Sequence, residues 1–184
     1  MKWAEIKNKS PYEILEMLEM REPPFNPFDI ARKLKLNVKT SLDYDKLGTE
    51  GQISVNENNE PEIWINPIKS EARQRFTLAH EIGHLANDIL PQIDNPIIDK
   101  YETLYRGNTY DIRETKANTF AAQLLMPLKP LENFIEKERQ KKNSNLTAEK
   151  AIILIADKFE VSRQAVFHRL QNLGLISKEY QYPF

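Results

Sequence analysis

The sequence of 184 residues has no cysteine and only three histidines. The absence of cysteine excludes a disulfide framework and any thiolate metal site, and it is typical of a protein in a reducing compartment such as the cytoplasm. Two of the three histidines, His80 and His84, stand in one five-residue segment. Any chemistry that depends on histidine is therefore expected to be concentrated in this segment.

The chain also has little net charge and no long apolar run. Its formal net charge is −1, so it lacks the basic excess that nucleic-acid-binding proteins carry. No apolar segment approaches the roughly 20 residues that span a bilayer, and the first residues lack the apolar core of a signal peptide. We therefore expect a cytoplasmic protein without a membrane partner, large enough for one domain and a small appendage.

Local patterns predict an α+β fold with a small antiparallel or mixed sheet. A strand is expected at 37–40 and a hairpin over 51–65. Proline and glycine at 91, 96 and 107 interrupt any regular pattern in 88–110. Capping residues and apolar periodicity predict helices at about 10–21, 27–34, 70–88, 111–126, 129–141, 147–159 and 162–173.

The segment His80-Glu81-Ile82-Gly83-His84 has the HExxH spacing of zinc peptidases. Residues four apart lie on one face of a helix, so both imidazoles can reach one metal ion. Glu81 lies to one side of them and can act as the general base toward water. The surrounding helix is apolar nearly all round, and buried histidines cost free energy unless a metal compensates. We expect Gly83 to permit the close approach of another backbone.

A third ligand must come from elsewhere, with the fourth position left open for water. In the long metzincin form, a glycine and a third histidine would fall at Asn87 and Leu90, so that form is excluded. A carboxylate is therefore needed. The candidates are Asp88, Asp94, Asp99, Glu102, Asp111 and Glu114.

Glu114 is the favoured candidate because of its position on the helix predicted at 111–126. At about 100° per residue, it shares a face with Ala121 and Leu125, and the small side chains there allow close approach to the motif helix. Asn118, one turn on, could accept a hydrogen bond from a ligand imidazole. The alternative is that Glu114 merely completes a capping box with Asp111.

Two segments together carry a resemblance to a known family. RQRFTLAHEIGH at 73–84, followed by ETKANTFAA at 114–122 and LLMP at 124–127, closely resembles the ImmA/IrrE metallopeptidases of bacteria, phages and mobile elements. The resemblance covers most of residues 25–175, with the first 24 residues outside it, and it implies metal ligands His80, His84 and Glu114, with Glu81 catalytic. It implies a gluzincin-like metalloendopeptidase. A site of two histidines and one glutamate favours zinc, with manganese or iron as alternatives. We expect a zincin-like metallopeptidase domain over 1–140.

The resemblance also implies a protein substrate. The usual substrate in this family is a helix-turn-helix transcriptional repressor, whose cleavage at one site derepresses genes. A competing hypothesis is a non-proteolytic regulatory or antitoxin-like binding module that retains the metal-site fold. The strand over Gly51 to Val55 either borders the cleft and holds substrate as an added strand, or simply completes the sheet. The group that stabilises the oxyanion is unassigned among Tyr101, Tyr105 and Tyr110.

The C-terminal segment 145–184 has a helix-turn-helix-like pattern, in which Ser162 would cap the second helix. A DNA-binding regulator is thus a third hypothesis. Basic and acidic residues from Thr147 onward nearly balance, at +1, which is weak for neutralising phosphates. We therefore expect these helices to serve packing or substrate docking, with direct DNA binding disfavoured, and we expect His168 to be a surface residue.

Overall fold

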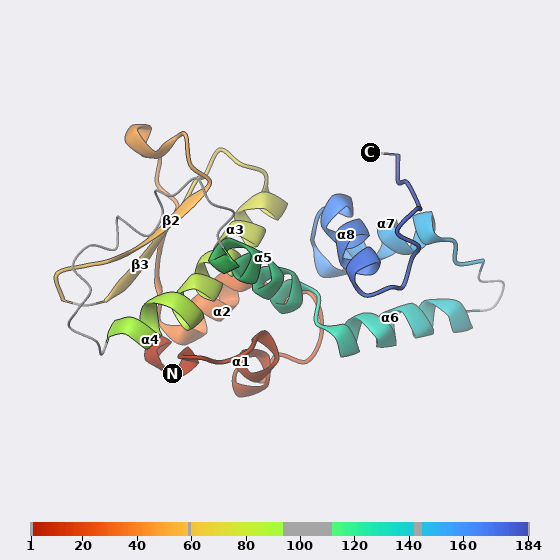
Figure 1. Ribbon diagram of the computed structural model, residues 1–184, viewed down its shortest axis with the longest axis horizontal. Helices are drawn as coiled ribbons and strands as arrows, with labels where there is room; N and C mark the ends of the chain where they lie inside the picture. The colour runs from red at the N-terminus through yellow and green to blue at the C-terminus, as the bar shows by residue number, and fades with distance from the viewer. Residues whose placement is uncertain (1, 59, 94–111, 142–144, 184) are drawn as a thin grey trace.

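The structure is a computed structural model that describes residues 2–58, 60–93, 112–141 and 145–183 (Figure 1). It confirms the α+β class. The strands are β1 (Asn37–Lys39), β2 (Gly51–Val55) and β3 (Pro61–Ile65). The α-helices are α1 (Pro11–Met17), α2 (Pro27–Leu34), α3 (Glu71–His84), α4 (Leu90–Ile93), α5 (Ile112–Leu125), α6 (Leu128–Gln140), α7 (Ala148–Phe159) and α8 (Arg163–Asn172). No described helix is both long and apolar enough to cross a membrane.

The sheet is mixed and has the order β1-β3-β2. β1 pairs in parallel with β3, and β2 pairs with β3 as the predicted antiparallel hairpin. Backbone bonds at both ends of the hairpin, Asn66 N–H to Glu50 O and Asn56 N–H to Glu60 O, fix which β2 residues face β3. Hydrogen-bonded and non-hydrogen-bonded residue pairs alternate along two antiparallel strands. Because residues 50 and 56 are hydrogen bonded to the returning strand, the backbone groups of residues 51, 53 and 55 point away from β3. Within the described parts of the chain, β2 is therefore an edge strand with one free side.

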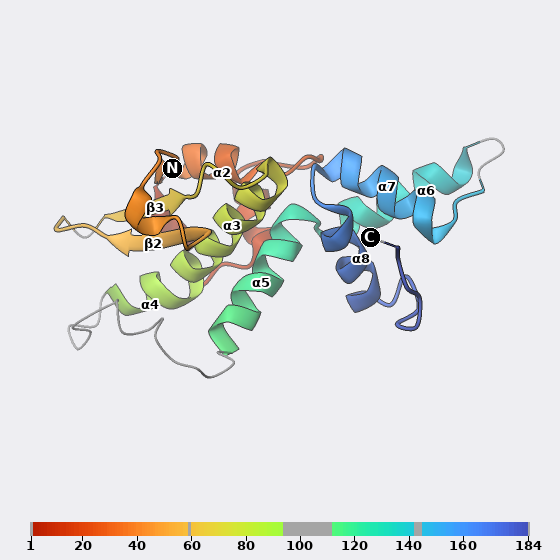
Figure 2. The same cartoon turned by 90° about the horizontal axis from the view of Figure 1, so that it is seen from above.

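Helix α3 lies at the centre of the molecule, between the sheet and α5 (Figure 2). Leu78, Ala79 and Ile82 on α3 are completely buried. At Gly83, an added Cβ would lie 3.0 Å from a ring atom of Phe120 on α5. The expectation for Gly83 is therefore corrected: the space is filled by an aromatic side chain instead of another backbone. The glycine allows the Phe120 ring to lie directly against α3.

Two predicted helix ends are displaced. α1 ends at Met17 instead of near residue 21, because Glu19 adopts a left-handed conformation with φ 55°. After α3, one turn of π-helix, η3 (Leu85–Ile89), leads into α4, so the helical path continues beyond residue 88. Pro91 lies inside this continued path and has no N–H to donate to the preceding turn. The Ala86 carbonyl in that turn accepts a hydrogen bond from the Asn8 N–H at 2.9 Å.

The C-terminal helices pack against the peptidase-motif half of the chain. α7 ends at Phe159, followed by its C-cap Glu160, which is left-handed with φ 53°, and the side chain of Ser162 caps α8 as predicted. Arg75 on α3 forms an ion pair with Glu160 at 2.6 Å. Arg169 on α8 donates from Nε to the carbonyl oxygen of Met126 at 3.2 Å. These contacts hold α8 beside the end of α5 (Figure 2).

Gly51 begins β2 at a point where a side chain does not fit. An added Cβ would lie 2.4 Å from Thr77 Cγ2 and 3.2 Å from the Trp64 carbonyl oxygen. We expect Gly51→Ala to lower the free energy of unfolding by about 1–3 kcal/mol, as overpacking of a filled interior does. Thr77→Ser removes the obstructing methyl group, so urea unfolding of the double variant should recover part of the loss. Strictly additive effects in this double-mutant cycle would contradict the steric explanation.

Candidate metal centre

Two elements bring three potential metal ligands together. His80 and His84 lie on one face of α3, with their Nε2 atoms 2.9 Å apart. Glu114 comes from the first turn of α5, and its two carboxylate oxygens lie 3.2 Å from the two Nε2 atoms, one from each. Among the residues that the structure describes, these three form the group of histidine and carboxylate side chains able to hold a metal ion.

The spacing of these donor atoms fits a tetrahedral cation. Ligand atoms bound at about 2.0–2.1 Å in tetrahedral geometry lie about 3.3 Å apart, close to the separations of 2.9 and 3.2 Å found here. When the proton of each neutral imidazole is on Nδ1, its Nε2 atom carries a lone pair. The two Nε2 lone pairs then face each other and the Glu114 carboxylate. Electron-rich atoms at these distances repel one another, and a bound cation converts that repulsion into attraction. The donor set therefore fits a divalent metal.

Each imidazole has a polar partner on its other nitrogen. Nδ1 of His80 lies 3.0 Å from Oδ1 of Asn118, the residue that the sequence indicated as a support. Nδ1 of His84 lies 2.6 Å from Oδ2 of Asp88. An ionised carboxylate only accepts hydrogen bonds, so His84 donates from Nδ1 and its Nε2 is free to bind a metal. Asp88, a candidate third ligand by sequence, contacts the outer nitrogen of His84 instead.

Charges around the site shift the pKa values of its members. Burial is the main reason why the pKa of the Glu81 carboxyl is raised to about 7. The charge of Glu114 also raises this pKa, whereas the charge of His84 lowers it. A hydrogen bond from the Ile53 backbone to the Glu81 carboxylate lowers the pKa in part. Although burial alone lowers the pKa of His84, its hydrogen bond with Asp88 and the charge of Glu81 outweigh that effect and raise it.

The cluster lies in an open cleft of about 1030 Å³. All five residues of β2, Gly51 to Val55, line this cleft together with His80, Glu81, His84 and Glu114. The strand therefore borders the cleft, as the first of the two alternatives requires, and its role in holding substrate stays a prediction. The free side of β2 faces the cleft, because the Ile53 N–H reaches the Glu81 carboxylate there.

Several sequence expectations fall elsewhere. The candidate ligands Asp94, Asp99, Glu102 and Asp111, and the tyrosines at 101, 105 and 110, lie outside the described residues. His168 is exposed on α8, as expected. Sequence reasoning missed the partnership of Asp88 with His84, although its position four residues after His84 was a usable signal. It also missed the Ile53 N–H, which no pattern of side chains indicates.

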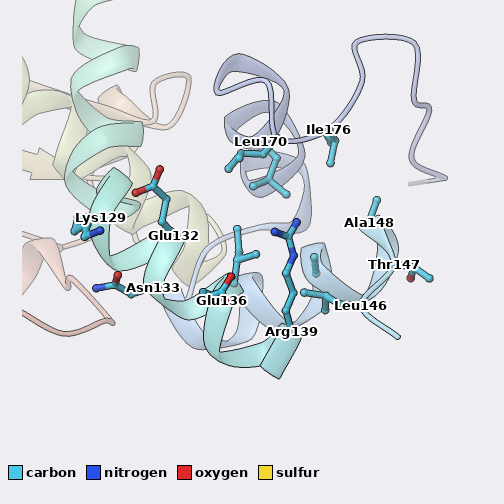
Figure 3. Close-up of a pocket in the computed structure, with 13 residues that line it drawn as sticks. Lys129, Glu132, Asn133, Glu136, Arg139, Leu146, Thr147, Ala148, Leu170 and Ile176 are labelled. Carbon is cyan, nitrogen blue, oxygen red and sulfur yellow. The ribbon is translucent and has the colours of Figure 1, made fainter. Parts of the chain in front are cut away.

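A separate hollow of about 460 Å³ lies between α6, α7, α8 and the tail (Figure 3). Its charged lining residues are Lys129, Glu132, Glu136 and Arg139. It contains no histidine, and no metal-binding group was found there among the described residues. The chemistry that the sequence motifs indicate therefore belongs to the cleft beside β2.

Comparison with known proteins agrees with this location. The family model for the IrrE N-terminal-like domain of M78 peptidases matches residues 30–171. The uncharacterized immunity region protein 2 of Bacillus phage phi105 is 29% identical over 127 residues, which cover 66% of this chain and 74% of the phage protein. The radiation response metalloprotease IrrE of Deinococcus radiodurans is 37% identical over 75 residues, which cover 41% of this chain and 22% of IrrE.

A solved structure of a Mycobacterium tuberculosis transcriptional regulator has a similar fold, with a TM-score of 0.56 at 14% identity. The match covers 100% of this chain and 55% of that protein, and at this identity it shows the fold alone. The family match includes both helices of the candidate metal centre, α3 and α5. The chain therefore belongs to the IrrE N-terminal-like domain family of M78 peptidases.

Proposed function

We propose that the chain is a zinc-dependent metalloendopeptidase with its catalytic centre in the cleft beside β2. His80, His84 and Glu114 hold the metal, with manganese or another divalent ion as a substitute, and Glu81 is the general base. The observation that carries this proposal is the convergence of the three donors within 4.8 Å of one another, beside a buried glutamate. Family membership supports a metallopeptidase.

A bound zinc ion would polarise the scissile carbonyl and make water a stronger acid. Glu81, next in sequence to His80 and turned into the same cleft, accepts a proton from the attacking water on its carboxylate. It then transfers that proton to the leaving amine nitrogen. Asn118 and Asp88 hold the two imidazole rings in orientation through their Nδ1 atoms. Burial of Glu81, which is 7% exposed, keeps bulk water from competing for that proton.

The free edge of β2 supports a peptide substrate in extended form. An added strand would hydrogen bond to the backbone groups of residues 51, 53 and 55 that point away from β3. The Ile53 N–H is already engaged by Glu81. The remaining groups at Gly51 and Val55, and the Ile53 carbonyl, are the ones that a substrate backbone would use.

We assign residues 1–140 to a zincin-like peptidase domain and 145–184 to a helix-turn-helix-like segment. The segment serves packing and substrate docking instead of DNA binding. Arg169, one of its few basic residues, is 8% exposed and donates to Met126 in the body of the protein. The substrate we propose is a cytoplasmic helix-turn-helix repressor. The names of two relatives, an immunity region protein and a radiation response metalloprotease, are consistent with regulatory proteolysis.

Intact-mass analysis tests this function. The zinc-loaded protein is incubated with purified helix-turn-helix repressors encoded in the same genome, and each mixture is analysed by mass spectrometry. We expect one repressor to yield two fragments whose masses sum to the parent plus one water. If a repressor is instead released from its operator without any fragment, and the Glu81→Gln variant does the same, the non-proteolytic binding module is the correct alternative.

The supporting residues should tune metal affinity without abolishing it. We expect Asp88→Asn and Asn118→Ala each to weaken zinc binding by about 10–100-fold, because a ligand imidazole loses its fixed orientation. Competition with a chromophoric chelator measures the change. Asp157→Asn, at an exposed position on α7, is the matched control. Affinities equal to that of the control would show that these partners do not orient the ligands.

A further inference from the structure

A second groove opens from the metal centre toward α8. It has a volume of about 1450 Å³ and lies between α5, α8 and the first turns of α3. Both this groove and the β2 cleft are lined by Glu50, Arg73, Phe76, Glu114 and Asn118, so the two hollows are continuous. We call its far part the α8 groove, whose wall on the C-terminal side is Ser162, Gln164, Ala165, His168 and Arg169.

The α8 groove contains cations that no acidic side chain among the described residues neutralises. Glu50 forms an ion pair with Arg73, and the Glu114 carboxylate faces the two imidazoles. In the parts of the chain that the structure describes, neither Lys69 nor Arg169 forms an ion pair with a carboxylate. Arg169 is buried, and a buried guanidinium without a counter-charge costs free energy that a bound anion would recover.

Two helix N-termini add to this positive potential. Ser70 caps α3 and Ser162 caps α8, and both residues line the α8 groove. The N-terminus of a helix carries about half a positive charge, which favours acidic groups nearby. The groove thus combines the buried Arg169 and the exposed Lys69 with two helix N-termini. The occupant that fits this chemistry bears a carboxylate.

The direction of β2 shows which part of a substrate would reach this groove. Antiparallel pairing is the more stable of the two arrangements per residue, so we take the added strand as antiparallel to β2. Because β2 runs from Gly51 to Val55, such a strand runs from the Val55 end toward the Gly51 end. Glu50, Arg73 and Phe76, which join the cleft to the groove, lie at the Gly51 end. A peptide that passes the metal centre in this direction therefore enters the α8 groove with the residues C-terminal to the scissile bond.

We propose that the α8 groove binds the substrate segment C-terminal to the scissile bond, and that this segment carries an acidic side chain facing Lys69 and Arg169. This inference rests on the proposed peptidase function and identifies where specificity resides. A polypeptide fits better than nucleic acid because the groove continues into a cleft bounded by an edge strand, whose backbone groups pair with an extended peptide. In this proposal α8, the second helix of the helix-turn-helix-like pair, contacts the protein substrate instead of DNA.

The first test is charge reversal at Lys69. The zinc-loaded full chain is incubated with a proteome-derived peptide library, and cleavage sites are identified by mass spectrometry. We expect aspartate and glutamate to be enriched C-terminal to the cleavage site for the wild type. In Lys69→Glu the enrichment should fall by about threefold to tenfold. This is the fold-change expected when one exposed ion pair is replaced by a repulsive pair of like charges. Lys116→Glu is the matched control, because Lys116 is exposed on α5 outside both hollows.

The second test fills the groove. Gln164→Trp places a large side chain into it, whereas Arg163→Trp places the same side chain at the neighbouring exposed position outside it. We expect Gln164→Trp to slow cleavage of peptides with long C-terminal extensions by about tenfold, with no loss for peptides that end shortly after the scissile bond. Arg163→Trp should cleave both classes like the wild type. Zinc content and thermal unfolding should match in all variants.

The outcomes separate the two proposals. Cleavage by the wild type with equal acidic preference in Lys69→Glu, or equal rates in Gln164→Trp, overturns the assignment of the groove and leaves the peptidase intact. Cleavage of neither the peptide library nor the repressor panel by the zinc-loaded wild type removes the peptidase and this inference together. Cleavage of a repressor at a site with no acidic residue C-terminal to it overturns this inference alone. Salt-dependent binding of a short DNA duplex that Lys69→Glu abolishes would assign the groove to nucleic acid and overturn the proposal.

Discussion

Glu81→Gln is expected to lower the rate of substrate cleavage by about 10²–10⁴-fold while leaving the metal content unchanged. The amide has nearly the same shape as the carboxylate but cannot accept the proton of the attacking water. Glu81 is not among the converging donors, so zinc should still bind to His80, His84 and Glu114. The measurement is the single-turnover rate on the cleaved repressor, together with zinc analysis of the same samples.

A matched control for this variant lies on the same helix. Glu71 is in the first turn of α3, exposed and outside the cleft, so Glu71→Gln removes one charge without touching the site. We expect its cleavage rate to equal that of the wild type. A Glu81→Gln protein that cleaves as fast as Glu71→Gln would rule out Glu81 as the base.

Loss of a ligand should have the second large effect. We expect His84→Ala and Glu114→Ala proteins to contain far less than one zinc per chain after dialysis, because a site with two remaining ligands holds the metal poorly. Metal that binds only the folded state stabilises it by about 4 kcal/mol when its concentration is 1,000 times Kd. A chelator should therefore lower the melting temperature of the wild type and leave that of the two variants nearly unchanged.

The control here is Glu132→Ala, because Glu132 lies in the separate hollow beside α6 (Figure 3). It should retain one zinc per chain and respond to the chelator as the wild type does. His84→Ala also leaves Asp88 without its partner, so Glu114→Ala is the cleaner of the two substitutions. Stoichiometric zinc in both ligand variants would disprove the metal centre.

Local spacing was enough to predict part of this site. His80 and His84 are four residues apart in a segment with strong helical periodicity, and their shared face follows from helix geometry alone. Glu114 was favoured by the same geometry on a second helix. The proximity of Glu114 to the histidines depends on how α3 and α5 pack. The Phe120 ring lies in the space beside Gly83 and is part of that packing.

Other features depended on backbone paths that residue types do not specify. The sequence indicated a helix ending near 88, and Asp88 was weighed as a ligand. One π turn at Leu85–Ile89 carries the chain onward, and the Asp88 side chain lies against His84 Nδ1. The hydrogen bond from the Ile53 backbone to Glu81 could not be predicted from the sequence either, because every residue except proline has the same backbone N–H.

The sequence by itself determined the HExxH helix, the hairpin, the capped C-terminal helices and the family, because each depends on periodicity or on short-range spacing. The tertiary structure alone decided that β2 presents its free edge to the candidate metal centre and that α8 lines a second groove, which contains Lys69 and Arg169 and is continuous with the cleft. Both depend on contacts between segments far apart in the chain, such as Arg75 with Glu160 and Arg169 with Met126. Such contacts arise from the packing of whole surfaces, which no local pattern encodes.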